Sequence, residues 1–131
     1  MQFAYTIVYV PDVAASLDFF ARAFGLPTRF LHESGAYGEV ETGAAGPRLA
    51  FVDLDTARDS VQHDFVAAHA SAQPLGMELG FTVADVAAAY ARAVEAGARP
   101  LAAPVAKPWG QVVAYVRCPD GCLVELCTAM G

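Results

Sequence analysis

Two stretches of the chain alternate apolar and polar residues with the period of a β-strand and then change to the period of a helix. Residues 3–10 are rich in Val, Ile, Tyr and Thr, which favour strands. Asp12 is a good helix N-cap and Gly25 a typical helix terminator. The pattern therefore predicts a strand and then a helix whose apolar stripe has spacings of four, three and four: Val13, Leu17, Phe20 and Phe24.

The same pattern recurs 73 residues later in the chain. Five residues are identical at the matching positions: Val10, Asp12, Val13, Ala14 and Ala15 recur as Val83, Asp85, Val86, Ala87 and Ala88. Three strand-like runs follow each predicted helix, at about 28–33, 36–42 and 48–54 and at about 99–103, 111–118 and 122–128. We interpret this pattern as a duplicated β-α-β-β-β unit.

The predicted fold class is therefore α+β, in a single domain of two tandem βαβββ modules. The modules span about 1–54 and 76–131, and their curved sheets are expected to surround a shared cavity with the helices outside. Residues 55–75 have no clear periodicity and are expected to form a linker, with or without a lid, and with a short helix within 61–70.

Glu78 lies on the polar side of the strand that opens the second module. Leu79, Phe81 and Val83 form an apolar face that suits the following helix, so Glu78 is expected to point to the opposite side of the sheet. A buried carboxylate without a partner is strongly unfavourable. Water, a metal, a hydrogen-bond donor or a ligand must therefore satisfy it.

The last hairpin is predicted to bring a second carboxylate to the same side. If Cys118 faces Cys122 across a Pro-Asp-Gly turn, Tyr115 lies opposite Glu125. A two-residue loop would instead pair Val116 with Glu125. The first register keeps the apolar residues on the helix side, so we prefer it, and it places Glu125 on the same side of the sheet as Glu78.

Composition excludes several classes of partner. The chain has 131 residues, of which 56% are hydrophobic, and a net charge of -6, which gives no basic patch for nucleic acid or an anionic membrane. The sequence shows no apolar run of membrane-span length and no signal peptide, so we expect a cytoplasmic protein. Cys118, Cys122 and Cys127 are expected to be free thiols, with a Cys118–Cys122 disulfide as the alternative.

Two segments carry a resemblance to a known family. VPDVAASLDFFARAFGL opens the first module, and WGQVVAYVRCPDGCLVEL closes the second with a PDG-x-x-x-E motif. Together with the duplication, they resemble the glyoxalase, bleomycin-resistance and extradiol-dioxygenase superfamily, also called the vicinal oxygen chelate family. The resemblance covers essentially the whole chain. It implies a homodimer, which light scattering at micromolar protein would test, and exposed sheet edges are consistent with such pairing.

The resemblance also implies where metal ligands would lie. The first-strand positions are Tyr5 and Glu78, where the family usually has His or Gln and His, and the last-strand position is Glu125, which matches. Its counterpart in the first module is expected near Val52 or Asp53. Such oxygen ligands favour magnesium, calcium or manganese over zinc or nickel. We therefore expect no cofactor, with a divalent metal on Glu78 and Glu125 as the alternative.

The histidines do not restore an imidazole ligand, because none of them falls at a family ligand position: His32, His63 and His69. We interpret the last two as surface residues, with contact to a ligand as the alternative. No nucleophile elbow, P-loop or dinucleotide fingerprint is present, which leaves hydrolase, kinase and nicotinamide-dependent readings without support.

The leading functional hypothesis is a small-molecule-binding protein or divergent enzyme with an acidic, aromatic-lined pocket. Its ligand is expected to be cationic or rich in hydroxyl and amine donors. The residues expected to form this pocket are Tyr5, Tyr9, Glu78, Trp109, Gln111, Tyr115 and Glu125. The alternative is a divalent-metal-dependent lyase or isomerase acting on a glutathione adduct, in which Glu78 or Glu125 moves the proton.

Each candidate also has a purely structural interpretation. Glu78 and Glu125 are metal ligands, a general acid/base pair, or carboxylates paired with Arg117 or Tyr115. Without a metal, two neighbouring carboxylates repel each other, which raises the pKa of at least one of them. Trp109 either stacks on a ligand or packs over the end of the sheets.

Overall fold

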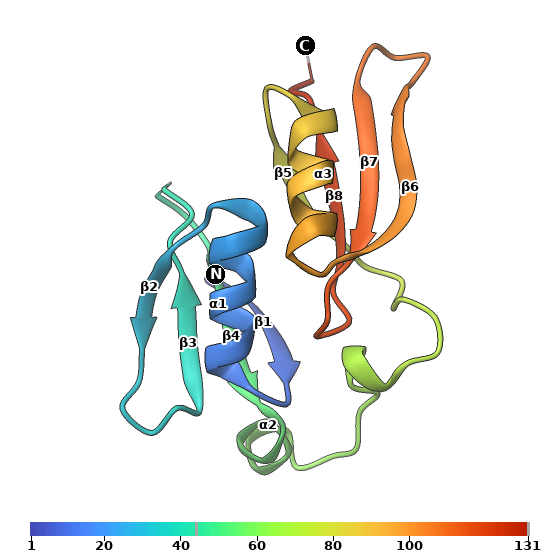
Figure 1. Cartoon of the computed structure of the whole chain (residues 1–131). Helices are drawn as coiled ribbons and strands as arrows, with labels where there is room; N and C mark the ends of the chain where they lie inside the picture. Colours follow the sequence, from blue (N-terminus) through green and yellow to red (C-terminus); the bar gives the residue numbers. More distant parts are fainter. Residues whose placement is uncertain (44, 131) are drawn as a thin grey trace.

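The computed structural model describes residues 1–43 and 45–130 and consists of two similar modules (Figure 1). The first contains β1 (Tyr5–Val10), α1 (Val13–Phe24), β2 (Thr28–Leu31), β3 (Tyr37–Val40) and β4 (Arg48–Asp53). The second contains β5 (Leu79–Thr82), α3 (Val86–Ala96), β6 (Arg99–Ala106), β7 (Val112–Arg117) and β8 (Leu123–Cys127). The predicted α+β duplication is confirmed.

The two modules have the same strand order, β1-β4-β3-β2 and β5-β8-β7-β6. In each sheet the first strand is parallel to the last strand of its module, and the remaining pairs are antiparallel. One helix covers one face of each sheet, and the other face carries no helix of its own module (Figure 1). That open face is where the sequence placed the candidate site.

Both long helices begin at the aspartate that the sequence identified as a cap. The Asp12 and Asp85 side chains accept hydrogen bonds, each of 3.0 Å, from the backbone N–H of Ala15 and Ala88. Gly25 ends α1 in the left-handed conformation, with a φ of 68°. These local interactions explain why the helix bounds were readable from sequence.

The modules are held together through their helices. α1 and α3 lie against each other, and the Phe24 ring of α1 lies 5.7 Å from Phe81 of β5 between ring centroids. Within the first module, Phe20 packs on Phe51 at 5.1 Å, and both side chains are fully buried. Aromatic contacts of this kind join both sheets to one continuous core.

A buried polar contact also crosses between the modules. The Ser16 hydroxyl of α1 donates a 2.9 Å hydrogen bond to the Asp120 carboxylate in the Pro-Asp-Gly turn. Ser16 is 5% exposed and Asp120 is 7% exposed. Because water reaches neither group readily, the Ser16 hydroxyl depends on Asp120 for its acceptor, while Asp120 also accepts from the Cys122 N–H.

The linker differs from the prediction. Its regular helix is α2 (Leu54–Val61), and only a short 3-10 helix, η1 (Ala68–Ala70), forms within the segment where a helix was expected. The reason is Asp53, whose carboxylate accepts a 2.8 Å hydrogen bond from the Thr56 N–H and starts α2 directly after β4. Asp53 is thereby used as a helix cap.

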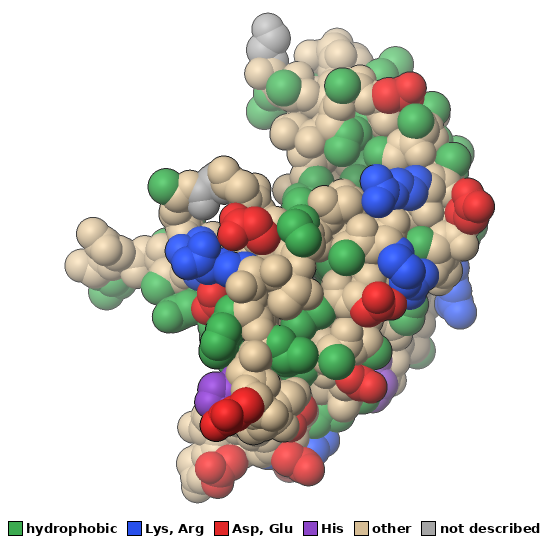
Figure 2. All heavy atoms as spheres, turned by 60° about the vertical axis from the view of Figure 1, so that its left-hand side comes forward, with side chains coloured by type: hydrophobic (Ala, Val, Ile, Leu, Met, Phe, Trp, Pro, Cys, Tyr) green, Lys and Arg blue, Asp and Glu red, His purple; other side chains and the backbone are tan. Residues whose placement is uncertain are grey.

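The molecular surface is mixed in charge. On the face shown in Figure 2, acidic and basic side chains are interspersed, with hydrophobic side chains between them and an indentation between two lobes. Among the described residues, no helix is long and apolar enough to cross a bilayer. Cys118, Cys122 and Cys127 are buried free thiols, as expected.

Candidate functional site

The final hairpin has the predicted register and builds the first part of the site. Tyr115 lies opposite Glu125, and Val116 lies opposite Val124. The Tyr115 hydroxyl donates a 2.9 Å hydrogen bond to Glu125 Oε1. This bond to the carboxylate, with smaller effects of desolvation and charge, raises the pKa of Tyr115 to about 12. Of the two structural partners considered for Glu125, Tyr115 is the one that contacts it.

Glu78 completes the carboxylate pair. It is the residue immediately before β5, and its side chain is exposed at the open face. Partial desolvation raises the pKa of Glu78, and the charge of Glu125 and a hydrogen bond with it raise the pKa further. This is the direction expected for two neighbouring carboxylates without a cation between them.

A groove runs beside Glu78 between the two modules. It has a volume of about 170 Å³ and lies between β1 and the starts of β5 and β8. Its walls are mainly apolar and include Ile7, Tyr9, Val66, Met77, Glu78 and Leu123. Glu78 is the only carboxylate among the residues lining this groove. Sequence reasoning found Tyr9 and Glu78, but not the linker residues, whose position follows from tertiary contacts.

The linker forms one wall because β7 and the β7–β8 turn hold it in place. We call residues 62–75 the strap. The Arg117 guanidinium donates hydrogen bonds to the backbone carbonyls of Ala68 and Ser71, at 2.9 and 2.8 Å, and to Ala72 at 3.4 Å. Gly121 lies so close to the strap that a Cβ there would overlap the Ala68 carbonyl. Arg117 is therefore an anchor for the strap.

Trp109 and Gln111 lie away from the residues that line the groove. Trp109 is 62% exposed, and its indole N–H donates a 2.8 Å hydrogen bond to Gln111 Oε1. The Gln111 amide in turn donates to the Thr128 carbonyl at 2.8 Å. The pair is thus ordered near the β6–β7 turn, and its contact with a ligand stays a prediction.

Other candidates lie on the surface. Tyr5 is 51% exposed on the open face of the first sheet. His63 is exposed and its Nδ1 lies 2.7 Å from the carbonyl of Asp64. His69 is also exposed, on the strap.

The strand register corrects the expected ligand position in the first module. Gly80 pairs with Glu125, and its counterpart in the repeat, Ile7, pairs with Ala50. Ala50 is therefore the position equivalent to Glu125, and the earlier placement near Val52 or Asp53 is wrong. Parallel pairing between β1 and β4 settles this register, and no local sequence motif reveals it.

This register leaves a weak donor set for a metal. The four equivalent positions hold Tyr5, Ala50, Glu78 and Glu125, of which two are carboxylates and one is a methyl group. Among the described residues, no group of three His, Cys, Asp or Glu side chains is placed to hold a metal. Stable divalent sites need more ligands than this pair provides. The residues do not fit the metal centre that the resemblance implied.

Two hydrogen-bonded groups of side chains near these positions were not predicted from the sequence. Desolvation, together with a hydrogen bond to Glu125, raises the pKa of the Cys127 thiol. In the first module, Tyr37 donates a 2.7 Å hydrogen bond to Glu39, which also pairs with Arg29 at 3.4 Å. In each group the two hydrogen-bonded side chains lie two residues apart on one strand, β8 or β3, and so share one face of that strand.

Replacing Glu78 with Gln is expected to stabilise the protein more at pH 8 than at pH 4. The folded-state pKa of Glu78 is raised, so its ionisation carries no penalty below the unfolded-state pKa. The penalty grows as pH rises from the unfolded to the folded pKa and is complete above both. Because the side chain is exposed, we expect a difference of about 0.5 kcal/mol in the free energy of unfolding. Urea unfolding at both pH values measures it.

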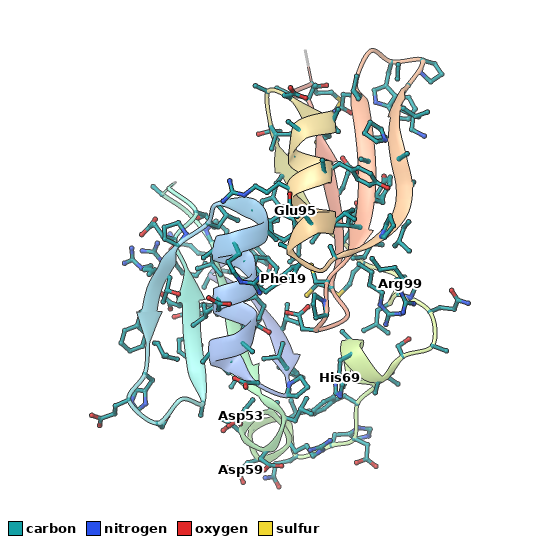
Figure 3. The ribbon with its side chains drawn as sticks, in the orientation of Figure 1. Phe19, Asp53, Asp59, His69, Glu95 and Arg99 are labelled. Carbon is teal, nitrogen blue, oxygen red and sulfur yellow. The ribbon has the colours of Figure 1, made fainter. Side chains whose placement is uncertain are left out.

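Glu95→Gln is the matched control, since Glu95 is exposed on α3 and its loss changes the net charge equally (Figure 3). Glu95→Gln should change the free energy of unfolding by the same amount at pH 8 and at pH 4. A Glu78→Gln variant less stable than the wild type at pH 8 would show that a cation already compensates the Glu78 charge.

Solved structures share this architecture. A glyoxalase-related enzyme from Fulvimarina pelagi is 26% identical, with a TM-score of 0.81 over 98% of this chain and 88% of that chain. A glyoxalase/bleomycin resistance protein/dioxygenase family enzyme from Burkholderia phytofirmans PsJN is 19% identical, with a TM-score of 0.78 over 99% of this chain and 100% of that chain. The second similarity concerns the fold alone. No curated protein matches the sequence.

The sequence comparison agrees with the duplicated strand order, the capped helices and the closing Pro-Asp-Gly hairpin. The profile of the Glyoxalase/Bleomycin resistance protein/Dioxygenase superfamily matches residues 2–126, and the chain belongs to this superfamily.

Proposed function

We propose that the protein binds a small organic molecule in the groove beside Glu78. The observation that carries this proposal is the raised pKa of Glu78 at the edge of an apolar groove, next to Glu125. Among the described residues, neither carboxylate forms a salt bridge with a basic side chain. A ligand with an amine or hydroxyl group would donate to this pair while its apolar part contacts Ile7 and Met77.

The carboxylates have different surroundings, which suits different roles. The Tyr115 hydroxyl donates to Glu125 Oε1, so Glu125 acts as an acceptor there. Glu78 retains its proton to higher pH and can donate as well as accept. If the protein is an enzyme, this pair supplies a proton acceptor and a proton donor at one end of the groove.

The second candidate function is that of a metal-dependent lyase, and its support comes from membership of the superfamily. The donor set argues against it, because Ala50 occupies the position equivalent to Glu125. Elemental analysis of protein purified without chelator should find less than stoichiometric metal. Stoichiometric metal together with turnover of methylglyoxal and glutathione would replace our proposal with this one.

A thermal-shift screen with polyamines, amino sugars and polyols tests the binding proposal. We expect at least one compound to stabilise the wild type, and Glu78→Gln to weaken its binding by roughly tenfold or more through loss of a charged hydrogen-bond acceptor. Trp109→Ala tests, in the same assay, the predicted contact between Trp109 and the ligand.

Glu95→Gln removes an equal charge outside the groove and should bind like the wild type. If Glu78→Gln and Trp109→Ala both left the ligand-induced stabilisation unchanged, the pocket assignment would be wrong. Equal losses of ligand binding in Glu78→Gln and Glu95→Gln would indicate that the net charge of the protein attracts the ligand, and that no defined site at Glu78 binds it.

We also propose that the protein is a homodimer. The open face and edge of the first sheet expose large apolar side chains, including Phe3 at 71%, Tyr5 at 51% and Ile7 at 41%. Association with a second copy would remove this apolar surface from water. The light-scattering measurement described above tests this proposal.

A further inference from the structure

A second pocket lies on the other side of the strap from the groove. It has a volume of about 340 Å³ and is lined by the strap, the start of β6 and the β7–β8 turn. His69 from the strap and Arg99 from β6 both border it, as their positions in Figure 3 indicate. Gly121 contributes to both cavities, so its contact with the strap separates them.

The side chains around this pocket concentrate positive charge in an acidic protein. The lining includes Arg99, Arg117 and His69 and contains no Asp or Glu, although the net charge of the chain is -6. Arg99 and Arg117 lie directly opposite each other on β6 and β7. Like charges at such a position destabilise a strand pair unless a counter-charge lies nearby.

In the part of the chain that the structure describes, no carboxylate forms a salt bridge with Arg99 or Arg117. Among the described residues, the salt bridges involve other arginines, and the Arg117 guanidinium contacts only backbone carbonyls. Those contacts hold the half-buried Arg117 side chain in place at the pocket. Arg99 remains exposed, with its guanidinium available at the pocket.

We propose that this second pocket binds a small oxyanion, the phosphate or carboxylate group of a metabolite. A guanidinium group presents paired N–H donors that match the oxygens of either group. Arg99 would make the direct contact, the fixed charge of Arg117 would add to the attraction, and His69 would approach from the strap. This site is independent of ligand binding beside Glu78.

Titration of the ¹⁵N-labelled protein with inorganic phosphate, followed by NMR, tests the proposal. Acetate forms a second arm, and chloride at matched ionic strength is the reference. We expect saturable shifts of the Gly97, Gly121 and strap amides with phosphate, acetate or both. Phosphate alone identifies a phosphate site, and acetate alone a carboxylate site; either result supports an oxyanion pocket.

Arg99→Ala should weaken this binding by about tenfold or more, the size expected for a charged hydrogen bond. The variant should fold, because Arg99 is exposed on the edge strand β6. Lys107→Ala removes the same charge beyond the other end of β6 and should bind like the wild type. The proposal is overturned if neither anion gives saturable shifts, or if both variants weaken binding equally.

Discussion

Gly121→Ala is expected to lower the free energy of unfolding by about 3 kcal/mol, the size typical of a clash combined with backbone strain. Gly121 has a φ of +92°, which L-residues rarely adopt, and an added Cβ would lie 2.5 Å from the His69 backbone nitrogen. Because the obstacle is backbone, no side-chain rotation relieves it. Urea unfolding measures the loss.

Gly35→Ala separates the two causes of this loss. Gly35 has a similar positive φ of +74°, but a Cβ there would meet nothing within 4 Å. Gly35→Ala should therefore lower the free energy of unfolding only through the strain of a positive φ, by about 1 kcal/mol. Equal losses in the two variants would mean that the strap moves aside and that its contact with Gly121 contributes little. Increased hydrogen exchange within residues 66–72 of Gly121→Ala would show directly that the strap had loosened.

Asp120→Ala is expected to cost about 2–3 kcal/mol of stability. The substitution removes the carboxylate that accepts from Ser16, leaving a hydroxyl that is 5% exposed without its partner. It also removes the acceptor of the Cys122 N–H, 3.2 Å from Asp120 Oδ1. Leaving buried donors unpaired costs more than the net gain from forming the bond. Thermal and urea unfolding both report this loss.

The exposed pair formed by Asp18 and Arg22 provides the control. Asp18→Ala breaks a 2.8 Å salt bridge on the same helix as Ser16, but its partners are 66% and 53% exposed. Solvent screens such a pair, so the cost should stay below about 1 kcal/mol. If Asp120→Ala were no more costly than this control, the bond between the modules would not be an important part of the core.

Several features of the site followed from local pattern. A three-residue Pro-Asp-Gly turn combined with the apolar alternation specified the pairing of Tyr115 with Glu125, and the structure has that register. The Asp12 and Asp85 caps were likewise visible, because a cap bonds to an N–H only three residues ahead. The raised pKa of Glu78 agrees in direction with the sequence prediction, because the strand pattern had already placed both carboxylates on one face.

Other features required the folded chain. Asp53 was considered near a metal-ligand position, but it caps α2, and Ala50 is the true counterpart of Glu125. A one-residue change in the pairing of β1 with β4 would exchange the side chains that face the site. The sequence pattern of β4 did not distinguish these registers. Only the tertiary structure therefore shows that Ala50, which cannot ligate a metal, occupies this potential ligand position.

The amino-acid sequence alone determined the repeat, the bounds of α1 and α3 and the final hairpin, because the helix caps and the hairpin turn join residues close in the chain. Only the tertiary structure decided where the strap lies, through Arg117 and Gly121, and how Ser16 meets Asp120 across 104 residues. Periodicity specifies which face of an element is apolar but not which distant backbone will lie against it. Both pockets depend on such contacts, since the strap forms a wall of each.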